Sequence, residues 1–316
     1  MSVVIPLHNA ERYIGETLDS LAAQTVAPHE VIVVDDGSTD EGAAVVAAYR
    51  FPDGSRPVLI QNQRPLGVAM ARNLGVFHAT GDWVGLCDND DLWHPRRIEL
   101  VLQAAAGRPE AHAVSTGATG FALASERAAL DGHQRGRMVE HWVTGGSAEV
   151  LGKEVGEIGR PAEREITFAD LQVGTCFVTT QVCFRREAYA LAGGCAPWCY
   201  RADDWVLNAS ASLLAPILHL EVPLVFYRVR ASSESHHQAE SALSLLAAAL
   251  AFRFGGSKPD TRPASELYVH LVRLGARERW PLSSVLALGV LGGMPHRQRA
   301  SVAKTWLRTR AHVRDR

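Results

Sequence analysis

Residues 83–91 are Trp-Val-Gly-Leu-Cys-Asp-Asn-Asp-Asp, a short apolar run followed directly by three carboxylates. The apolar part follows Gly81-Asp82 and is typical of a short buried strand. In open α/β sheets, ligands bind beyond the carboxyl ends of the strands. Crowded like charges raise each other's pKa and cost stability unless a cation or strong donors neutralise them. The position of these acids therefore predicts a ligand site.

Two interpretations of this acidic group are open from its residues alone. Mg²⁺ and Mn²⁺ prefer oxygen ligands, and Mg²⁺ sites usually share the ion with substrate phosphates. The alternative is an acidic turn with solvated carboxylates. The rest of the chain is needed to choose between them.

The first third of the chain alternates apolar runs with amphipathic stretches. Strands are predicted at residues 2–6, 30–34 and 58–60, and a helix is predicted from Gly67 to Ala79. We expect Asn9 to cap the first helix, and Ser38 with Glu41 to form a capping box for the second. This alternation indicates a parallel sheet with crossover helices.

After about Val114 the alternation breaks down. Residues 130–165 predict a long mobile loop over a site or an irregular insertion, because loops of this length are uncommon unless functional. Order returns with predicted strands at 176–184 and 224–229 and a helix at 203–214. Beyond Glu234 the pattern is helical and ends in a basic amphipathic stretch. That stretch indicates either contact with an anionic membrane face or a solvated helix packed on the domain.

Composition narrows the class of protein. A formal net charge of -2 over 316 residues gives no general attraction to nucleic acid. The five cysteines form no Cys-x-x-Cys pair, which argues against a zinc knuckle, and with no secretory signal ahead of the first strand they indicate reduced thiols in the cytoplasm. The longest apolar runs are too short to span a bilayer.

Further polar groups follow the other predicted strands, at residues 6–9 and 35–38, and one lies much later at 201–205. A carboxylate behind the second strand can bind a ribose hydroxyl or a base edge. Neither a Gly-x-Gly-x-x-Gly fingerprint nor a Gly-Lys-Ser/Thr phosphate loop is present. The pattern therefore favours a nucleotide whose phosphates are held by a metal ion. A nucleotidyltransferase lacks support because no glycine-rich loop with lysine follows strand one, and a haloacid-dehalogenase-like site lacks Asp-x-Asp there.

Four ordered motifs, at residues 2–9, 31–40, 67–73 and 88–91, resemble the nucleotide-sugar half of family 2 glycosyltransferases. The resemblance implies the GT-A fold, an α/β architecture with a mostly parallel central sheet flanked by helices. It divides the chain into a domain at 1–235, with a nucleotide-sugar half at 1–114 and an acceptor half at 115–235, and a helical C-terminal extension at 236–316. Looser matches in the acceptor half include residues 184–187, 203–205 and 227–228.

The resemblance also implies roles for individual residues. Asp204 is expected to be the general base, with Asp203 as the fallback, although the pair also suits the first turn of a helix. Asp90 and Asp91 are expected to hold Mg²⁺ or Mn²⁺ on the donor diphosphate. The expected nucleotide-sugar-binding residues are Pro6, His8, Asn9, Asp36, Gly67, Arg72, Asp88 and Arg230.

Arg230 is a departure from the family pattern, since many relatives carry histidine at this position after the Tyr-Arg motif. Arginine cannot ligate a metal, but its fork pairs with phosphate. Arg279-Trp280 is preceded by Ala276 instead of the glutamine of the processive synthases, which favours transfer of single sugars.

The resemblance thus implies a metal-dependent inverting glycosyltransferase. Its donor is expected to be a nucleoside diphosphate-sugar, most simply a UDP-sugar, and its acceptor a hydroxyl of a sugar, lipid-linked glycan or small molecule. The alternative is a catalytically silent nucleotide-sugar-binding protein or scaffold. We expect a cytoplasmic protein, with peripheral membrane contact through the basic C-terminal helix as a further expectation.

Overall fold

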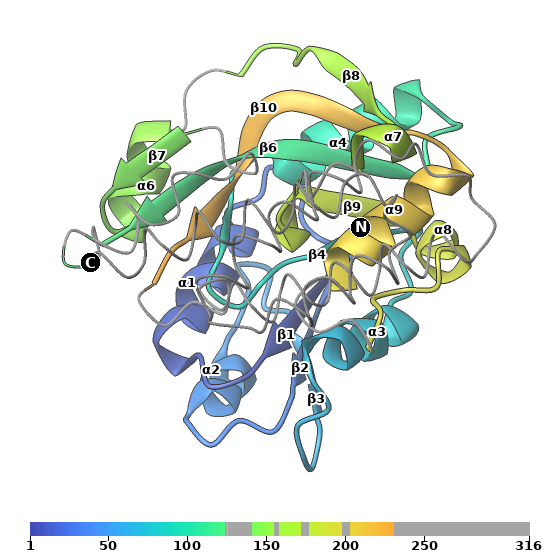
Figure 1. Ribbon diagram of the computed structural model, residues 1–316. Coiled ribbons are helices and arrows are strands. Elements are labelled where there is room, and N and C mark those ends of the chain that lie inside the picture. The colour runs from blue at the N-terminus through green and yellow to red at the C-terminus, as the bar shows by residue number, and fades with distance from the viewer. Residues whose placement is uncertain (124, 126–140, 155–157, 172–176, 198–202, 231–316) are drawn as a thin grey trace, which may run out of the picture.

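A computed structural model describes the chain except for residues 124, 126–140, 155–157, 172–176, 198–202 and 231–316 (Figure 1). Its helices and strands alternate through the first third, as predicted. In chain order they are β1 Ser2–Leu7, α1 Glu11–Ala22, β2 Glu30–Asp35, α2 Gly42–Ala48, β3 Val58–Gln61, α3 Val68–His78, β4 Trp83–Leu86, β5 Leu92–Trp93, α4 Arg97–Gly107, β6 Ala113–Ala122, β7 His141–Thr144, α6 Ser147–Glu154, β8 Glu163–Ile166, α7 Phe168–Leu171, η2 Thr179–Gln181, β9 Val182–Arg185, α8 Arg186–Leu191, α9 Asp203–Leu214 and β10 Ile217–Arg228.

The strands form one mixed sheet in the order β3-β2-β1-β4-β9-β6-β10-β5, with β7 pairing β6 and β8 pairing β10. β1 to β4 are parallel to one another, which confirms the α/β architecture expected from the alternating pattern. β9 lies antiparallel between β4 and β6, so it joins the parallel strands β1 to β4 to the later strands.

Helices cover both faces of the parallel part of the sheet, with α1 and α2 on one side of β1 and α3 on the other (Figure 1). The alternation of side chains along β1 explains this arrangement. Val3, Ile5 and Leu7 belong to the core under α1, whereas Val4 belongs to the core under α3. α3 packs so closely that a Cβ atom at Gly75 would meet the Val4 side chain.

The later elements differ from several expectations. The predicted strand at 176–184 is shorter, because η2 precedes β9 and only Val182–Arg185 joins the ladder. The predicted mobile loop at 130–165 contains β7, α6 and β8 among its described residues, since residues 141–144 and 163–166 pair with existing strands. The rest of that loop, the boundary near 235 and the helical extension at 236–316 with its basic end lie outside the described residues.

Two predicted helix caps are wrong, because both polar side chains join neighbouring loops instead. α1 has Ala10 at its N-cap, while the Asn9 Oδ1 atom accepts the Thr39 amide at 2.8 Å. α2 begins at Gly42, and Ser38 Oγ accepts the Asn9 amide at 3.1 Å. Asn9 also adopts a positive φ of 48°, which helical capping geometry does not use.

Candidate active site

The carboxyl ends of β1, β2 and β4 meet at one edge of the sheet, because these strands are parallel. Leu7 at the end of β1 pairs with Asp35 at the end of β2, and Val4 pairs with Leu86. The turn after β4 is tied to β1 by Asn89, whose Nδ2 donates to the Pro6 carbonyl oxygen at 2.9 Å. The structure therefore brings together the first three polar groups, as the motifs predict.

Asp36 is buried at this edge and holds the chain that leads into α3. Its carboxylate accepts hydrogen bonds from Asn62 Nδ2 at 2.8 Å, the Leu66 amide at 2.9 Å and the Gly67 amide at 2.7 Å. Gly67 has a φ of +94°, a conformation that favours glycine. Asp36 thus shapes the wall of the predicted donor pocket through the backbone of residues 66 and 67.

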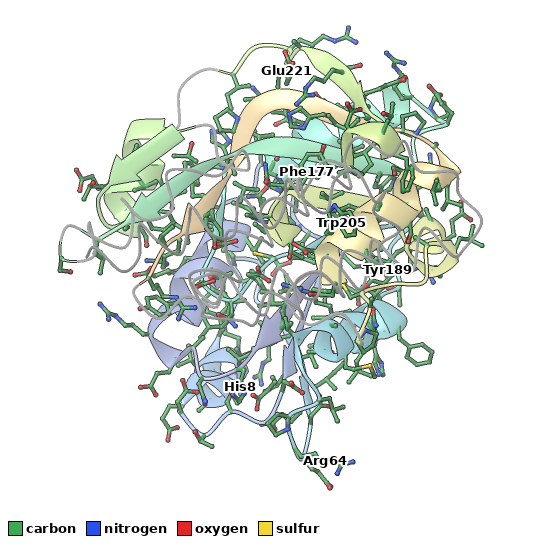
Figure 2. The ribbon with its side chains drawn as sticks, viewed as in Figure 1. His8, Arg64, Phe177, Tyr189, Trp205 and Glu221 are labelled. Carbon is green, nitrogen blue, oxygen red and sulfur yellow. The ribbon has the colours of Figure 1, made fainter. Side chains whose placement is uncertain are left out.

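His8 and Asn9 are both exposed at the end of β1, and Figure 2 labels His8 in the lower part of the view. The His8 Nδ1 atom lies 3.0 Å from the Asp36 carbonyl oxygen, which only accepts, so Nδ1 carries the proton. Asn9 bonds the loop after β2 through Thr39. Both residues therefore connect the ends of β1 and β2 and leave the His8 ring accessible.

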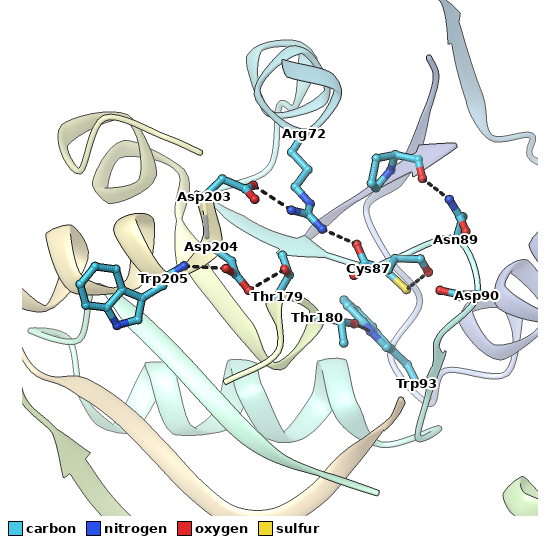
Figure 3. Close-up of polar contacts among 12 residues, drawn as sticks. Arg72, Cys87, Asn89, Asp90, Trp93, Thr179, Thr180, Asp203, Asp204 and Trp205 are labelled. Carbon is cyan, nitrogen blue, oxygen red and sulfur yellow. Dashed lines mark hydrogen bonds and ion pairs between the residues drawn. The ribbon is translucent and has the colours of Figure 1, made fainter. Parts of the chain in front are cut away.

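Arg72 links the two halves of the site (Figure 3). From α3, its guanidinium pairs with Asp88 Oδ1 at 2.7 Å and with Asp203 Oδ2 at 2.8 Å. Burial alone would lower the pKa of Arg72, but the carboxylates of Asp88 and Asp203 outweigh it and raise the pKa. A buried guanidinium with two carboxylates fixes the spacing between the β4 turn and the start of α9.

Asp203 and Asp204 both lie in the first turn of α9, yet their carboxylates have different surroundings. Asp203 is 3% exposed and engaged by Arg72. Asp204 is only partly buried; its Oδ2 accepts from Thr179 Oγ1 at 3.0 Å and its Oδ1 from the Trp205 amide at 2.7 Å. Burial and the charge of Asp203 raise the pKa of Asp204 from 3.8 to about 6. Asp204 is therefore the more accessible of the two carboxylates, and its pKa lies above that of an ordinary aspartate.

Trp205 anchors the first turn of α9, and its side chain is buried in the protein (Figure 2). Its Nε1 atom donates to the Leu171 carbonyl oxygen at 2.7 Å. This bond connects the first turn of α9 to α7 and limits rotation of the helix end that carries Asp204.

Asp90 and Asp91 are adjacent in sequence and differ in access. Asp90 Oδ2 pairs with Arg230 Nη2 at 2.6 Å, and both side chains keep some exposed area. Asp91 is fully buried, and its Oδ1 accepts the Arg228 amide at 3.0 Å. Burial raises the pKa of both carboxylates, and the neighbouring charge of Asp90 adds to the effect on Asp91. Asp88 and Asp90 are thus the acids with accessible surface.

Arg228 contacts more of the surrounding structure than its place in a Tyr-Arg motif indicates. Its Nε donates to the Asp90 carbonyl oxygen at 2.7 Å, and its Nη2 pairs with Glu16 at 2.5 Å. The guanidinium also lies over the rings of Tyr13 and Phe121. Arg228 therefore fixes the acidic turn against α1 and β10. In the sequence, the only signal for this role is a basic residue near the end of the strand predicted at 224–229.

The residues present suit a hard divalent cation in chemistry, with one complication. Asp88 and Asp90 offer oxygen donors, and one buried oxygen of Asp91 lacks a hydrogen-bond partner among the described residues. Within that same part of the chain, no three His, Cys, Asp or Glu side chains converge as a complete ligand set. A metal at this edge would therefore take further ligands from the donor phosphates, and it would compete with Arg230 for Asp90.

Comparison with known proteins gives the family. The model of "Glycosyl transferase family 2" matches residues 2–189, more than half of the chain. The chain belongs to glycosyl transferase family 2. It is an enzyme that transfers glycosyl groups, as the resemblance of the four motifs implies.

Curated relatives are consistent with this assignment. An uncharacterized glycosyltransferase of Nostoc sp. is 28% identical over 251 residues, covering 77% of this chain and 69% of the relative. The amylovoran biosynthesis glycosyltransferase AmsB of Erwinia amylovora is 42% identical over 103 residues, covering 32% of this chain and 34% of that protein. The stronger identity is therefore confined to a segment about a third of the chain long.

Solved structures share the fold. S. aureus TarS 1–349 in complex with UDP has a TM-score of 0.58 at 17% identity, covering 99% of this chain and 91% of that one. The mannosyltransferase PcManGT from Pyrobaculum calidifontis, in complex with GDP-Man and Mn²⁺, has a TM-score of 0.56 at 21% identity, covering 98% and 85%. These similarities confirm the GT-A fold.

In the described part of the chain, no helix combines the length and apolarity needed to cross a membrane. The expected location and membrane contact stay predictions.

Proposed function

We propose that this protein moves a single sugar from a nucleoside diphosphate-sugar, most simply a UDP-sugar, to an acceptor hydroxyl with inversion at the anomeric carbon. The observation that carries the proposal is the bridge from Asp88 through Arg72 to Asp203. It joins the acidic turn of the nucleotide-sugar half to the acids of the acceptor half. TarS and PcManGT, which share the fold, were solved with UDP and with GDP-Man respectively, which supports a nucleoside diphosphate in the donor.

Asp204 is the proposed general base. Its pKa of about 6 leaves it ionised at neutral pH yet more basic than an ordinary aspartate, which suits proton transfer near the working pH. Its carboxylate takes the proton from the acceptor hydroxyl as that oxygen forms a bond to the anomeric carbon. The bond from that carbon to the diphosphate breaks on the opposite face, and the electron pair leaves with the diphosphate. Attack opposite the leaving group inverts the configuration.

The donor is proposed to lie along the carboxyl edge of β1, β2 and β4. Pro6, His8 and the backbone wall held by Asp36 would surround the base and ribose, while Asp88 reaches the ribose from the other side. A Mg²⁺ or Mn²⁺ ion held by Asp90 would stabilise the negative charge that develops on the diphosphate. Asp91, which is fully buried, is proposed to support the turn through Arg228.

Donor binding to the purified full chain tests the proposal. A panel of UDP-, GDP- and other nucleoside diphosphate-sugars is screened for thermal stabilisation with and without Mn²⁺, because a ligand that binds only the folded state raises its stability. We expect one base and one sugar to stabilise the protein most strongly, and only with the metal. The best donor is then tested for turnover as release of the nucleoside diphosphate.

A catalytically silent nucleotide-sugar-binding protein predicts a different result. It would show the same stabilisation by donor but no release of nucleoside diphosphate with any acceptor in a panel of sugars and lipid-linked glycans. Absence of stabilisation by every donor, with and without Mn²⁺, would contradict both interpretations.

A further inference from the structure

Arg230 covers the carboxylate oxygen that a divalent cation would bind. Its Nη2 lies 2.6 Å from Asp90 Oδ2, and the two side chains are only 22% and 12% exposed. Solvent screens such a partly buried pair much less than a surface pair. An oxygen in contact with a guanidinium is a poor ligand for a second cation, because like charges repel at that distance.

The surroundings show which of two neighbouring arginines can leave Asp90. Arg228 lies at the end of β10, is 4% exposed, and is fixed by Glu16 and by the Asp90 carbonyl oxygen. Arg230 lies two residues beyond β10 and is more exposed. Both guanidinium carbons lie 5.0 Å from the centre of the Tyr13 ring, on which a planar guanidinium stacks. Arg228 thus holds the backbone of the turn, whereas the ion pair of Arg230 is with the carboxylate side chain of Asp90.

We infer that Arg230 is a positioning residue that closes the cation site at Asp90 in the donor-free enzyme and moves to the donor diphosphate when the donor binds. This inference rests on the proposed function. A diphosphate offers the guanidinium fork more charge and more oxygens than one carboxylate does. The exchange frees Asp90 for Mg²⁺ or Mn²⁺ at the moment the diphosphate arrives. Metal and diphosphate therefore bind cooperatively, and the coupling is reciprocal.

Mn²⁺ binding in the absence of nucleotide tests this inference without any assay of activity. Free Mn²⁺ is titrated with the wild type and with Arg230→Met, and the bound fraction is measured by electron paramagnetic resonance. We expect the variant to bind Mn²⁺ at least about fivefold more tightly, which lies at the lower end of measured couplings between sites. Equal affinities, or no Mn²⁺ binding by either protein, would overturn the inference.

Removal of any positive charge near Asp90 would also favour a cation, so a matched control is needed. Arg12→Met removes an exposed guanidinium that lies 5.4 Å from the same Tyr13 ring and forms no ion pair with Asp90 in the described part of the chain. We expect it to leave Mn²⁺ affinity within about twofold of the wild type, since exposed charges interact weakly. An increase as large as that of Arg230→Met would assign the effect to general charge. Arg230→Gln provides a second variant if the methionine variant does not fold.

The coupling itself is measured by repeating the titration with saturating UDP or GDP. In the wild type, the nucleoside diphosphate should raise Mn²⁺ affinity by a larger factor than in Arg230→Met, because the variant has no ion pair to open. An equal increase in Mn²⁺ affinity in both proteins would overturn the inference that Arg230 moves from Asp90 to the diphosphate. Failure of the proposed function has a different signature, in which no nucleoside diphosphate-sugar binds the wild type.

Discussion

Arg72 pairs with Asp203 at 2.8 Å, although the two residues lie 131 positions apart in the chain. The pair joins α3 to the first turn of α9. Its neighbour Asp204 does not pair with Arg72, and burial together with the charge of Asp203 raises the pKa of Asp204 to about 6. The two adjacent acids therefore have different surroundings, Asp203 in a buried ion pair and Asp204 only partly buried.

Arg72→Met should destabilise the protein strongly. The substitution leaves the buried Asp203 carboxylate unpaired and removes the partner of Asp88, and breaking a buried pair costs about 3–5 kcal/mol. The free energy of unfolding is measured by chemical denaturation. Arg164→Met is the control, since the Arg164–Glu221 pair is 53% and 51% exposed and should contribute less than about 1 kcal/mol. Similar losses of unfolding free energy in both variants would contradict the conclusion that the buried ion pairs of Arg72 stabilise the fold.

Asp204→Asn should abolish turnover and leave the affinity for the donor unchanged. Loss of a general base typically lowers the rate by about 100- to 10,000-fold, whereas the donor contacts are proposed to lie on other residues. Release of nucleoside diphosphate measures the rate, and calorimetry measures donor affinity. Near-normal turnover in the variant would remove Asp204 from its proposed role.

The pH dependence should carry the signature of the same residue. The wild-type rate should fall as pH drops through about 6, because Asp204 takes up a proton and can no longer accept one.

The free energy of unfolding should instead rise as pH drops through the same range. The folded protein holds this proton up to about pH 6 and the unfolded chain releases it near 3.8, so the contribution of Asp204 to stability falls as pH rises through this window. In Asp204→Asn that part of the slope should be absent, which denaturation at pH 4 and pH 7 can measure.

Asp36→Ala should weaken donor binding through the backbone. The substitution removes the acceptor for the Leu66 and Gly67 amides and for Asn62, and a buried donor left unpaired costs about 1–3 kcal/mol. We expect lower stability together with a higher dissociation constant for the donor. A stable variant with unchanged donor affinity would show that the wall of residues 62–67 does not shape the pocket.

Gly75→Ala tests the packing of α3 on β1. Alanine normally stabilises a helix interior relative to glycine, but here its Cβ would meet Val4, so we expect a net loss of about 1–3 kcal/mol. Gly107→Ala is the matched control, because a Cβ at the last residue of α4 meets no atom within 4 Å. The control should be neutral or slightly stabilising. The reverse order of the two variants would contradict the close approach of α3 to the sheet.

The sequence predicts the parallel strands β1 to β4 and the helices between them well, because local patterns determine them. A strand such as residues 83–86 is recognisable from its own apolar run, and parallel pairing then places its acids beside those of β2. Elements that form only through contacts between distant segments could not be predicted in this way. The short strand β5 exists because Leu92 and Trp93 pair with β10 more than 130 residues later, and its two residues carry no strand pattern of their own.

The same difference between local patterns and long-range contacts separates the site residues that were predicted from the contacts that were not. Asp90 and Asp204 lie in recognisable motifs. The ion pair of Asp90 with Arg230, and the support of the turn by Arg228, depend on the side chains at the end of β10 returning to α1. No spacing in the sequence indicates these contacts. The exchange proposed for Arg230 therefore rests on the three-dimensional arrangement alone.

The most direct measurement is an anomalous difference map from crystals grown with Mn²⁺ and UDP. The proposed function predicts a metal peak between the Asp90 carboxylate and the diphosphate, with Arg230 turned from Asp90 to a phosphate oxygen. A map with the nucleotide bound elsewhere, or with Arg230 still paired to Asp90 and no metal beside it, would contradict the account.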